Sequence, residues 1–229
     1  MNKSTIGLLL LPGAGMGSWV WRDVVSKLSI PAVAVDYPRD NATAGMDAYV
    51  ATAVEQANTL KTDKVVIVGH SFSGTIGLRV AEALGDRVAG YIGVAAILPA
   101  NGGSFVSALP FPQKLIMPLI IRLAGTKPPT ESIRKSYCND LDEATTKEVL
   151  DGYIAETKQI YFDRSALPPQ VPRLYIQTTK DSDFPIAMQD GMAKNLGAEQ
   201  KTTIETGHLP MLAKPDELAR QLNDFCGSL

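Results

Sequence analysis

The stretch KVVIVGHSFSG, residues 64–74, decides the fold of this chain. It opens with an apolar run of β-branched residues, which predicts a buried strand. After Ser71 apolar side chains recur at helical spacing as far as Gly85, which favours a helix with a glycine C-cap. A serine on a sharp turn between strand and helix is typical of a nucleophile elbow, which holds the hydroxyl at the carboxyl edge of a parallel sheet. The strict Gly-x-Ser-x-Gly pattern is not met, because Ser73 takes its fifth position, so a tight turn with a solvated serine is the alternative.

The same alternation of short apolar runs and helix-period segments continues along the chain. It predicts an α/β protein with parallel strands and helices on both faces of the sheet. Strands are expected over residues 5–11, 32–36, 64–68, 91–95, 173–178 and 202–205. Further helices are expected over residues 46–60 and from Pro215 onward, since proline suits the first turn of a helix.

Between about residues 99 and 169 this rhythm stops. The segment is rich in proline and helix-forming stretches, which predicts an insertion into a core made of residues 1–98 and 170–229. Its residues 105–123 are unusually apolar, and more polar helices are expected over 130–137 and 142–159.

Composition excludes several classes of protein. The chain has 229 residues, a formal net charge of −2, 45% apolar and 20% charged residues, so it resembles one folded domain and lacks the basic excess of a nucleic-acid binder. Two cysteines, Cys138 and Cys226, are too few for a disulfide framework. No window reaches the roughly 18 apolar residues of a membrane span, and the apolar run after Lys3 is too short for a secretory signal. A cytoplasmic protein without a membrane or nucleic-acid partner is therefore expected.

Two histidines are candidates for the base that a serine nucleophile needs. His70 adjoins Ser71, and the turn would direct its ring away from the hydroxyl, so we expect it to pack or hydrogen-bond locally. His208 follows the last expected strand on a loop at the same sheet edge, which makes it the candidate base, with an ordinary surface histidine as the alternative.

A carboxylate that orients the histidine completes such a site. Asp181 and Asp183 both follow the expected strand 173–178, so both are candidates. Either choice gives the chain order serine, acid, histidine, which is the order of one triad-bearing fold.

With these residues in this order, the chain resembles the α/β-hydrolase superfamily and, within it, the small esterase and hydroxynitrile lyase group. The matching pieces cover nearly the whole chain: residues 11–15 with Trp19 and Trp21, 69–74, 181–185 and 207–215. The resemblance implies an α/β-hydrolase fold with a sheet of about six strands and an exposed edge, in which the insertion forms a helical cap. It also implies that Asp181, four residues before Pro185, is the acid. The backbone N–H groups of Ala14 and Phe72 are then the oxyanion hole.

The chain departs from the family pattern at two places. Pro12-Gly13 stands where the family has His-Gly, so a side-chain hydrogen bond that supports the oxyanion loop is absent and the loop must be held otherwise. The better-known lyases of the group carry a lysine directly after the catalytic histidine and a threonine in the oxyanion loop, where this chain has Leu209 and Gly13. A cyanide leaving group then meets no cation there, which favours an esterase over a lyase.

We therefore expect a serine hydrolase that cleaves a small, largely apolar carboxylic ester, lactone or thioester through an acyl-enzyme, without a metal or cofactor. The expected substrate contacts are Phe111, Leu115, Met117, Leu119 and Leu209, although an apolar helix face more often packs into a core. Two alternatives stay open: a carbon–carbon lyase on the same triad, and a ligand-binding receptor that turns over very slowly. The sequence predicts no oligomeric state.

Overall fold

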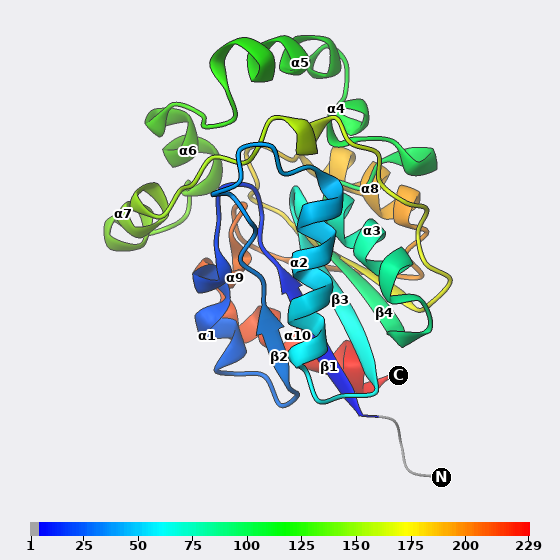
Figure 1. Ribbon diagram of the computed structural model, residues 1–229. Coiled ribbons are helices and arrows are strands. Elements are labelled where there is room, and N and C mark those ends of the chain that lie inside the picture. Colours follow the sequence, from blue (N-terminus) through cyan, green and yellow to red (C-terminus); the bar gives the residue numbers. More distant parts are fainter. Residues whose placement is uncertain (1–4) are drawn as a thin grey trace.

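Figure 1 shows the computed structural model, which describes residues 5–229. Six strands pair in the order β2-β1-β3-β4-β5-β6, and every pair is parallel. They are β1 (Ile6–Leu11), β2 (Ala32–Ala34), β3 (Lys64–His70), β4 (Val88–Val94), β5 (Arg173–Thr178) and β6 (Gln200–Ile204). All six expected strands are present, so the predicted parallel α/β sheet is confirmed. Residues 1–4, which the sequence analysis assigned to the core and which include Lys3, lie outside the described residues.

Helices cover both faces of this sheet, as expected. Because successive side chains of a strand point to opposite faces, Leu9 and Ile67 pack toward one set of helices, and Leu8 and Val66 pack toward the other. The first set is α2 (Met46–Thr59), α3 (Ser73–Leu84) and α8 (Ile186–Leu196); the second is α1 (Arg22–Val25), α9 (Pro210–Ala213) and α10 (Pro215–Gly227). Short 3₁₀ turns occupy Ser18–Trp21, Gly85–Arg87, Ala100–Gly102 and Gln159–Tyr161.

Helix α8 was not predicted. Polar residues and the interior Gly191 dilute its apolar spacing, so the helix depends on packing against β5 rather than on a strong sequence pattern. Among residues 5–229, no helix has both the length and the apolar character needed to cross a membrane.

The segment between β4 and β5 lies over the carboxyl ends of the strands, at the top of Figure 1. It contains α4 (Phe105–Ala108), α5 (Gln113–Ala124), α6 (Thr130–Tyr137) and α7 (Glu143–Asp151). The prediction of a helix over residues 142–159 is wrong beyond Asp151, where α7 ends. There the chain turns at Gly152, where an added Cβ would lie 2.9 Å from the Trp19 ring, and it continues as an extended segment. The division of the chain at residues 98 and 170 stays a prediction.

Candidate active site

Ser71 stands at the turn between β3 and α3 with a φ of 51°, a left-handed backbone that strains a residue with a side chain. Hydrogen bonds hold it on both sides: the Ser71 N–H donates to the Val94 carbonyl (3.0 Å), and the Ile97 N–H donates to the Ser71 carbonyl (2.8 Å). A Cβ at Gly74 would lie 2.5 Å from the Ile97 oxygen. The close approach that needs a glycine is thus at Gly74, which leaves position 73 free to carry a serine.

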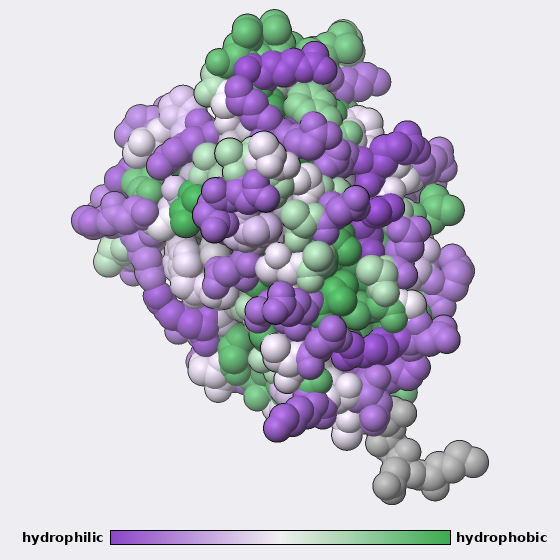
Figure 2. Space-filling model, in the orientation of Figure 1, coloured by the Kyte–Doolittle hydropathy of each residue, from purple (hydrophilic) through white to green (hydrophobic). Residues whose placement is uncertain are grey.

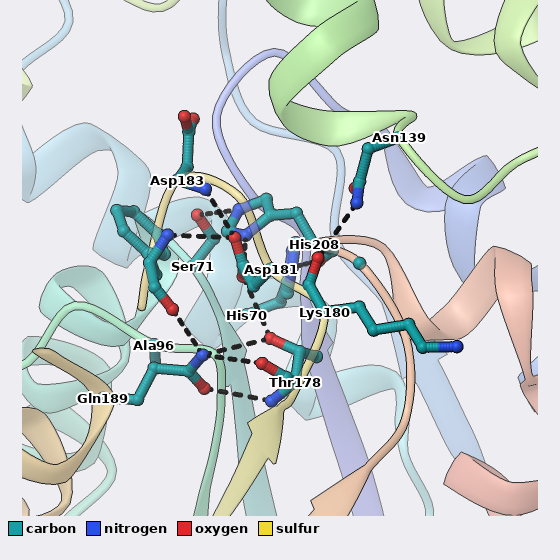
Figure 3. A network of polar contacts seen from close by, with 12 residues as sticks. His70, Ser71, Ala96, Asn139, Thr178, Lys180, Asp181, Asp183, Gln189 and His208 are labelled. Carbon is teal, nitrogen blue, oxygen red and sulfur yellow. Dashed lines mark hydrogen bonds and ion pairs between the residues drawn. The ribbon is translucent and has the colours of Figure 1, made fainter. Parts of the chain in front are cut away.

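The three residues singled out from the chain order meet at this turn (Figure 3). The Ser71 hydroxyl donates to Nε2 of His208 (2.8 Å), and Nδ1 of His208 donates to Oδ2 of Asp181 (2.7 Å). Asp183, the competing acid, is exposed, and its carboxylate points away from His208 in Figure 3. The geometry therefore identifies Asp181, rather than Asp183, as the aspartate bound to His208, a choice that spacing alone left open.

Asp181 is surrounded by donors. Its Oδ1 accepts from the N–H groups of Asp183 (3.0 Å) and Phe184 (2.9 Å), and its Oδ2 also accepts from the Thr178 hydroxyl (2.9 Å). Burial by itself raises the pKa of this carboxyl, but His208 and these donors outweigh burial and hold the pKa below its ordinary value. Asp181 is therefore an anion at neutral pH.

Burial and Asp181 act in opposite directions on His208. Burial lowers the pKa of the imidazole, whereas the charge and the hydrogen bond of Asp181 raise it, and the net result is a pKa above the ordinary 6.5. Burial and the neighbouring His208 lower the pKa of His70 to about 3, so His70 is neutral. Only His208 of the two is thus suited to accept and return a proton near neutral pH.

His70 has a structural contact that sequence reasoning did not foresee. Its Nε2 donates across the site to the backbone carbonyl of His208 (2.8 Å). Its partner is therefore the distant loop that carries the candidate base, rather than the local chain.

Other supports of these loops were also missed. The Asn139 amide donates to the Lys180 carbonyl (2.9 Å), and the Gly207 N–H donates to the Asp140 carboxylate (2.5 Å), so the loop after α6 holds both the Asp181 and the His208 loops. Gln189 of α8 donates to the Phe184 carbonyl (2.6 Å) and accepts from the Thr178 N–H (3.0 Å). Single polar residues in a helix or loop carry no sequence signal for such long-range contacts.

The N–H groups of Ala14 and Phe72 have no backbone or side-chain acceptor among residues 5–229. Both residues line the same cavity as Ser71. Two free N–H groups beside a serine hydroxyl can stabilise an oxyanion formed there.

The Ser73 hydroxyl is one of the groups that hold the loop of Pro12, where the family's supporting histidine is absent. It donates to the Pro12 carbonyl, and the Tyr37 hydroxyl in turn donates to Ser73 Oγ (2.8 Å). The serine that breaks the strict motif therefore ties the elbow to the loop that carries Ala14.

A family model for the alpha/beta hydrolase family matches residues 8–221. The chain belongs to this family. Relatives include putative methylesterase 11, chloroplastic, of Arabidopsis thaliana, which is 24% identical over 96% of this chain and 64% of its own length, and norfluorocurarine synthase 1 of Strychnos nux-vomica, which is 23% identical over 95% and 94%. The chain spans 56% of a second relative, putative methylesterase 15, chloroplastic, of Arabidopsis thaliana.

Solved structures show the same fold. An extracellular alpha/beta-hydrolase from a Paenibacillus species superposes with a TM-score of 0.84 at 17% identity, covering 97% of this chain and 98% of that one. A pyrethroid hydrolase from Sphingobium faniae JZ-2 superposes with a TM-score of 0.79 at 20% identity, covering 99% and 98%. The α/β-hydrolase fold expected from the resemblance is thereby confirmed.

The cavity above Ser71 in this alpha/beta hydrolase has a volume of about 380 Å³. Most of the residues that line it are apolar or aromatic: Ala14, Phe72, Phe105, Met117, Ile120, Ile121, Ala124, Pro128, Pro129, Ile133, Tyr137, Tyr153, Tyr161 and Phe184. Lys127 and Asp183 also line it, and the Lys127 ammonium donates to the Tyr153 carbonyl (3.3 Å).

Of the cap residues expected to line this cavity, only Met117 does so. Phe111, Leu115 and Leu119 are 72%, 65% and 58% exposed and lie outside the lining, so their prediction as substrate contacts is wrong. Ile120, Ile121 and Ala124, at helical spacing from Met117 on α5, also line the cavity. Leu115 and Leu119 therefore lie on the outer face of α5, whereas Phe111 precedes this helix. Apolar surface over α5 appears at the top of Figure 2.

Leu209 is also outside the main cavity. It is buried and borders a void beside Ser71 and His208 that is too narrow for water. Its side chain therefore adjoins the reactive groups, rather than the wall of the larger cavity.

We predict that Asp181→Asn slows phosphonylation of Ser71 by a fluorophosphonate reagent about 100-fold or more, because an amide favours the wrong tautomer of His208. Asp183→Asn keeps every backbone contact of its loop and should react within a few-fold of the wild-type rate. Labelling rates measured by mass spectrometry check the pair, and equal losses in the two variants contradict the assignment of Asp181.

We also predict a pH dependence of the same labelling reaction. His208 must be neutral to accept the Ser71 proton, so the rate should rise with pH and level off above a pKa that exceeds 6.5. The electrostatic effect of Asp183 on His208 is smaller than that of Asp181 and also raises the His208 pKa. The rate profile of Asp183→Asn should therefore shift slightly toward lower pH. A profile that is flat from pH 5 to 9 excludes His208 as the base.

Proposed function

We propose that this protein is a serine carboxylic-ester hydrolase that cleaves a small, largely apolar ester through an acyl-enzyme. The observation that carries the proposal is the continuous chain of hydrogen bonds from Asp181 through His208 to Ser71, next to the free N–H groups of Ala14 and Phe72. Membership of the alpha/beta hydrolase family and relatives named methylesterases support it.

The chemistry follows from these contacts. Ser71 Oγ attacks the acyl carbon while Nε2 of His208 takes its proton, and Asp181 stabilises the resulting imidazolium. The carbonyl oxygen becomes an oxyanion that accepts hydrogen bonds from the Ala14 and Phe72 N–H groups. When the tetrahedral intermediate collapses, His208 returns the proton to the departing alcohol.

Water completes the cycle. It attacks the acyl-enzyme as His208 removes one of its protons, and the second tetrahedral intermediate breaks the bond to Ser71, which regains a proton from His208. The products are a carboxylic acid and an alcohol. Besides the ester and water, these steps use only groups of this chain.

The cavity sets the substrate class that we propose. Its volume and its aromatic and aliphatic wall suit a small acyl group with little polarity. The methylesterase relatives make a methyl ester the first alcohol to test. A formal net charge of −2 also favours a small molecule over a nucleic acid as the partner.

We predict measurable hydrolysis of methyl and p-nitrophenyl esters of short aliphatic and aromatic acids. Ser71→Ala should lower kcat about 10⁴-fold or more, because the nucleophile is lost, and should leave the thermal unfolding midpoint nearly unchanged. A chain-length series from acetate upward, followed by product release, measures both effects. The nucleophile assignment is falsified if purified Ser71→Ala retains a tenth of the wild-type turnover.

We predict no cleavage of mandelonitrile above the buffer rate, because Leu209 directly after His208 offers no charge to a departing cyanide. Benzaldehyde release, followed by absorbance, is the measurement. If Ser71-dependent release exceeds ester turnover, the lyase alternative is correct, and Lys127→Met then tests whether the Lys127 ammonium in the cavity wall stabilises the cyanide. Tight binding of the esters without turnover would instead indicate the receptor.

A further inference from the structure

Hydrogen bonds join the loop that carries the Ala14 N–H to the extended segment that follows α7. The Ile154 N–H donates to the Gly15 carbonyl (3.0 Å), and the Gly15 N–H donates to Oε1 of Glu156 (2.8 Å). Gly15 has a φ of +79°, and an added Cβ would lie 2.3 Å from the Tyr153 ring. Both polar backbone groups of Gly15 are therefore bound by a segment about 140 residues away in the sequence.

Glu156 is fully buried, and both of its carboxylate oxygens accept hydrogen bonds. Besides the Gly15 N–H, its carboxylate accepts from the Tyr49 hydroxyl (2.7 Å) and from Nε (2.9 Å) and Nη2 (2.7 Å) of Arg39. Arg39 also donates to the Met16 carbonyl (2.6 Å). The two members of one buried ion pair thus bind opposite backbone groups of the same loop, on either side of the Gly15–Met16 peptide.

Stability alone is a weak reason for such a pair. Removing two charges from water costs several kcal/mol for each ion, and well-packed apolar residues often replace a buried ion pair without loss of stability. Placement of a backbone loop to within a fraction of an ångström, by contrast, is what oriented charged hydrogen bonds achieve.

We propose that Glu156 is a positioning residue that sets the Ala14 N–H for oxyanion stabilisation, in place of the histidine that this loop lacks. Glu156 acts through Gly15, the residue next to Ala14. Arg39 neutralises the carboxylate, which would otherwise oppose the negative charge that develops on the oxyanion. The inference rests on the proposed function, because it names a determinant of that same site.

Asp163 offers a matched control. It too is a carboxylate of the segment between β4 and β5 that accepts a backbone N–H of the core, from Met46 (2.7 Å), at the start of α2. Its contacts do not include the loop of residues 12–17. Glu156→Gln and Asp163→Asn therefore each replace a carboxylate that accepts a core backbone N–H with an amide, and only the first touches the oxyanion loop.

The test measures kcat and KM for the best ester, the thermal unfolding midpoint, and amide hydrogen exchange in peptides that cover residues 12–17. Glu156→Gln should lower kcat 10- to 100-fold with KM within about twofold, since a misplaced oxyanion donor costs transition-state rather than ground-state binding. Exchange over 12–17 should increase. Asp163→Asn should keep kcat within about threefold and leave this exchange unchanged.

Tyr49→Phe is the milder variant if Glu156→Gln does not fold. It removes a single donor to Glu156 and should lower kcat a few-fold at unchanged KM. The proposal is wrong if Glu156→Gln keeps more than half of the wild-type kcat, if Asp163→Asn loses as much, or if exchange over 12–17 does not change. Should the wild-type protein hydrolyse no ester, the proposed function fails, and hydrogen exchange alone still decides whether Glu156 holds the loop.

Discussion

The left-handed backbone of Ser71 is the constraint on which the rest of the site depends. A non-glycine residue in this conformation costs on the order of 1–3 kcal/mol and persists only where its surroundings determine it. Val94 and Ile97, at and after the end of β4, supply the backbone hydrogen bonds, and Gly74 permits the close approach to Ile97. The result is a hydroxyl aimed at His208, with the Phe72 N–H beside it in the same cavity.

The segment between β4 and β5 does more than cover the cavity. Asn139 and Asp140 hold the loops of Asp181 and His208, and Glu156 holds the loop of Ala14. Each of these contacts links the segment to a different loop at the carboxyl edge of the sheet. The segment between β4 and β5 and the loops that carry the reactive groups are therefore joined by hydrogen bonds.

The errors in the sequence analysis have a common origin. Phe111, Leu115 and Leu119 were chosen for their apolar character, but hydropathy does not distinguish the two faces of an apolar helix, and of the chosen residues on α5 only Met117 lies on the inner face. Helix α8 was overlooked because its signal is weak, yet it supplies Gln189 to the loop of Asp181. Both errors concern packing partners, which local periodicity does not contain.

The sequence by itself determined the parallel sheet, the turn at Ser71 and the placement of Ser71, Asp181 and His208 at one sheet edge. Strand period, turn residues and chain order are local properties, and parallel strands bring their carboxyl ends together whatever the intervening helices are. The family resemblance already selected Asp181 over Asp183, and the tertiary structure places Asp181 against His208. Only the tertiary structure gave Ser73 and Glu156 their contacts with the oxyanion loop and chose which face of α5 lines the cavity. These outcomes depend on where side chains distant in the sequence meet to within a hydrogen-bond length, and spacing along the chain carries no information about such distances.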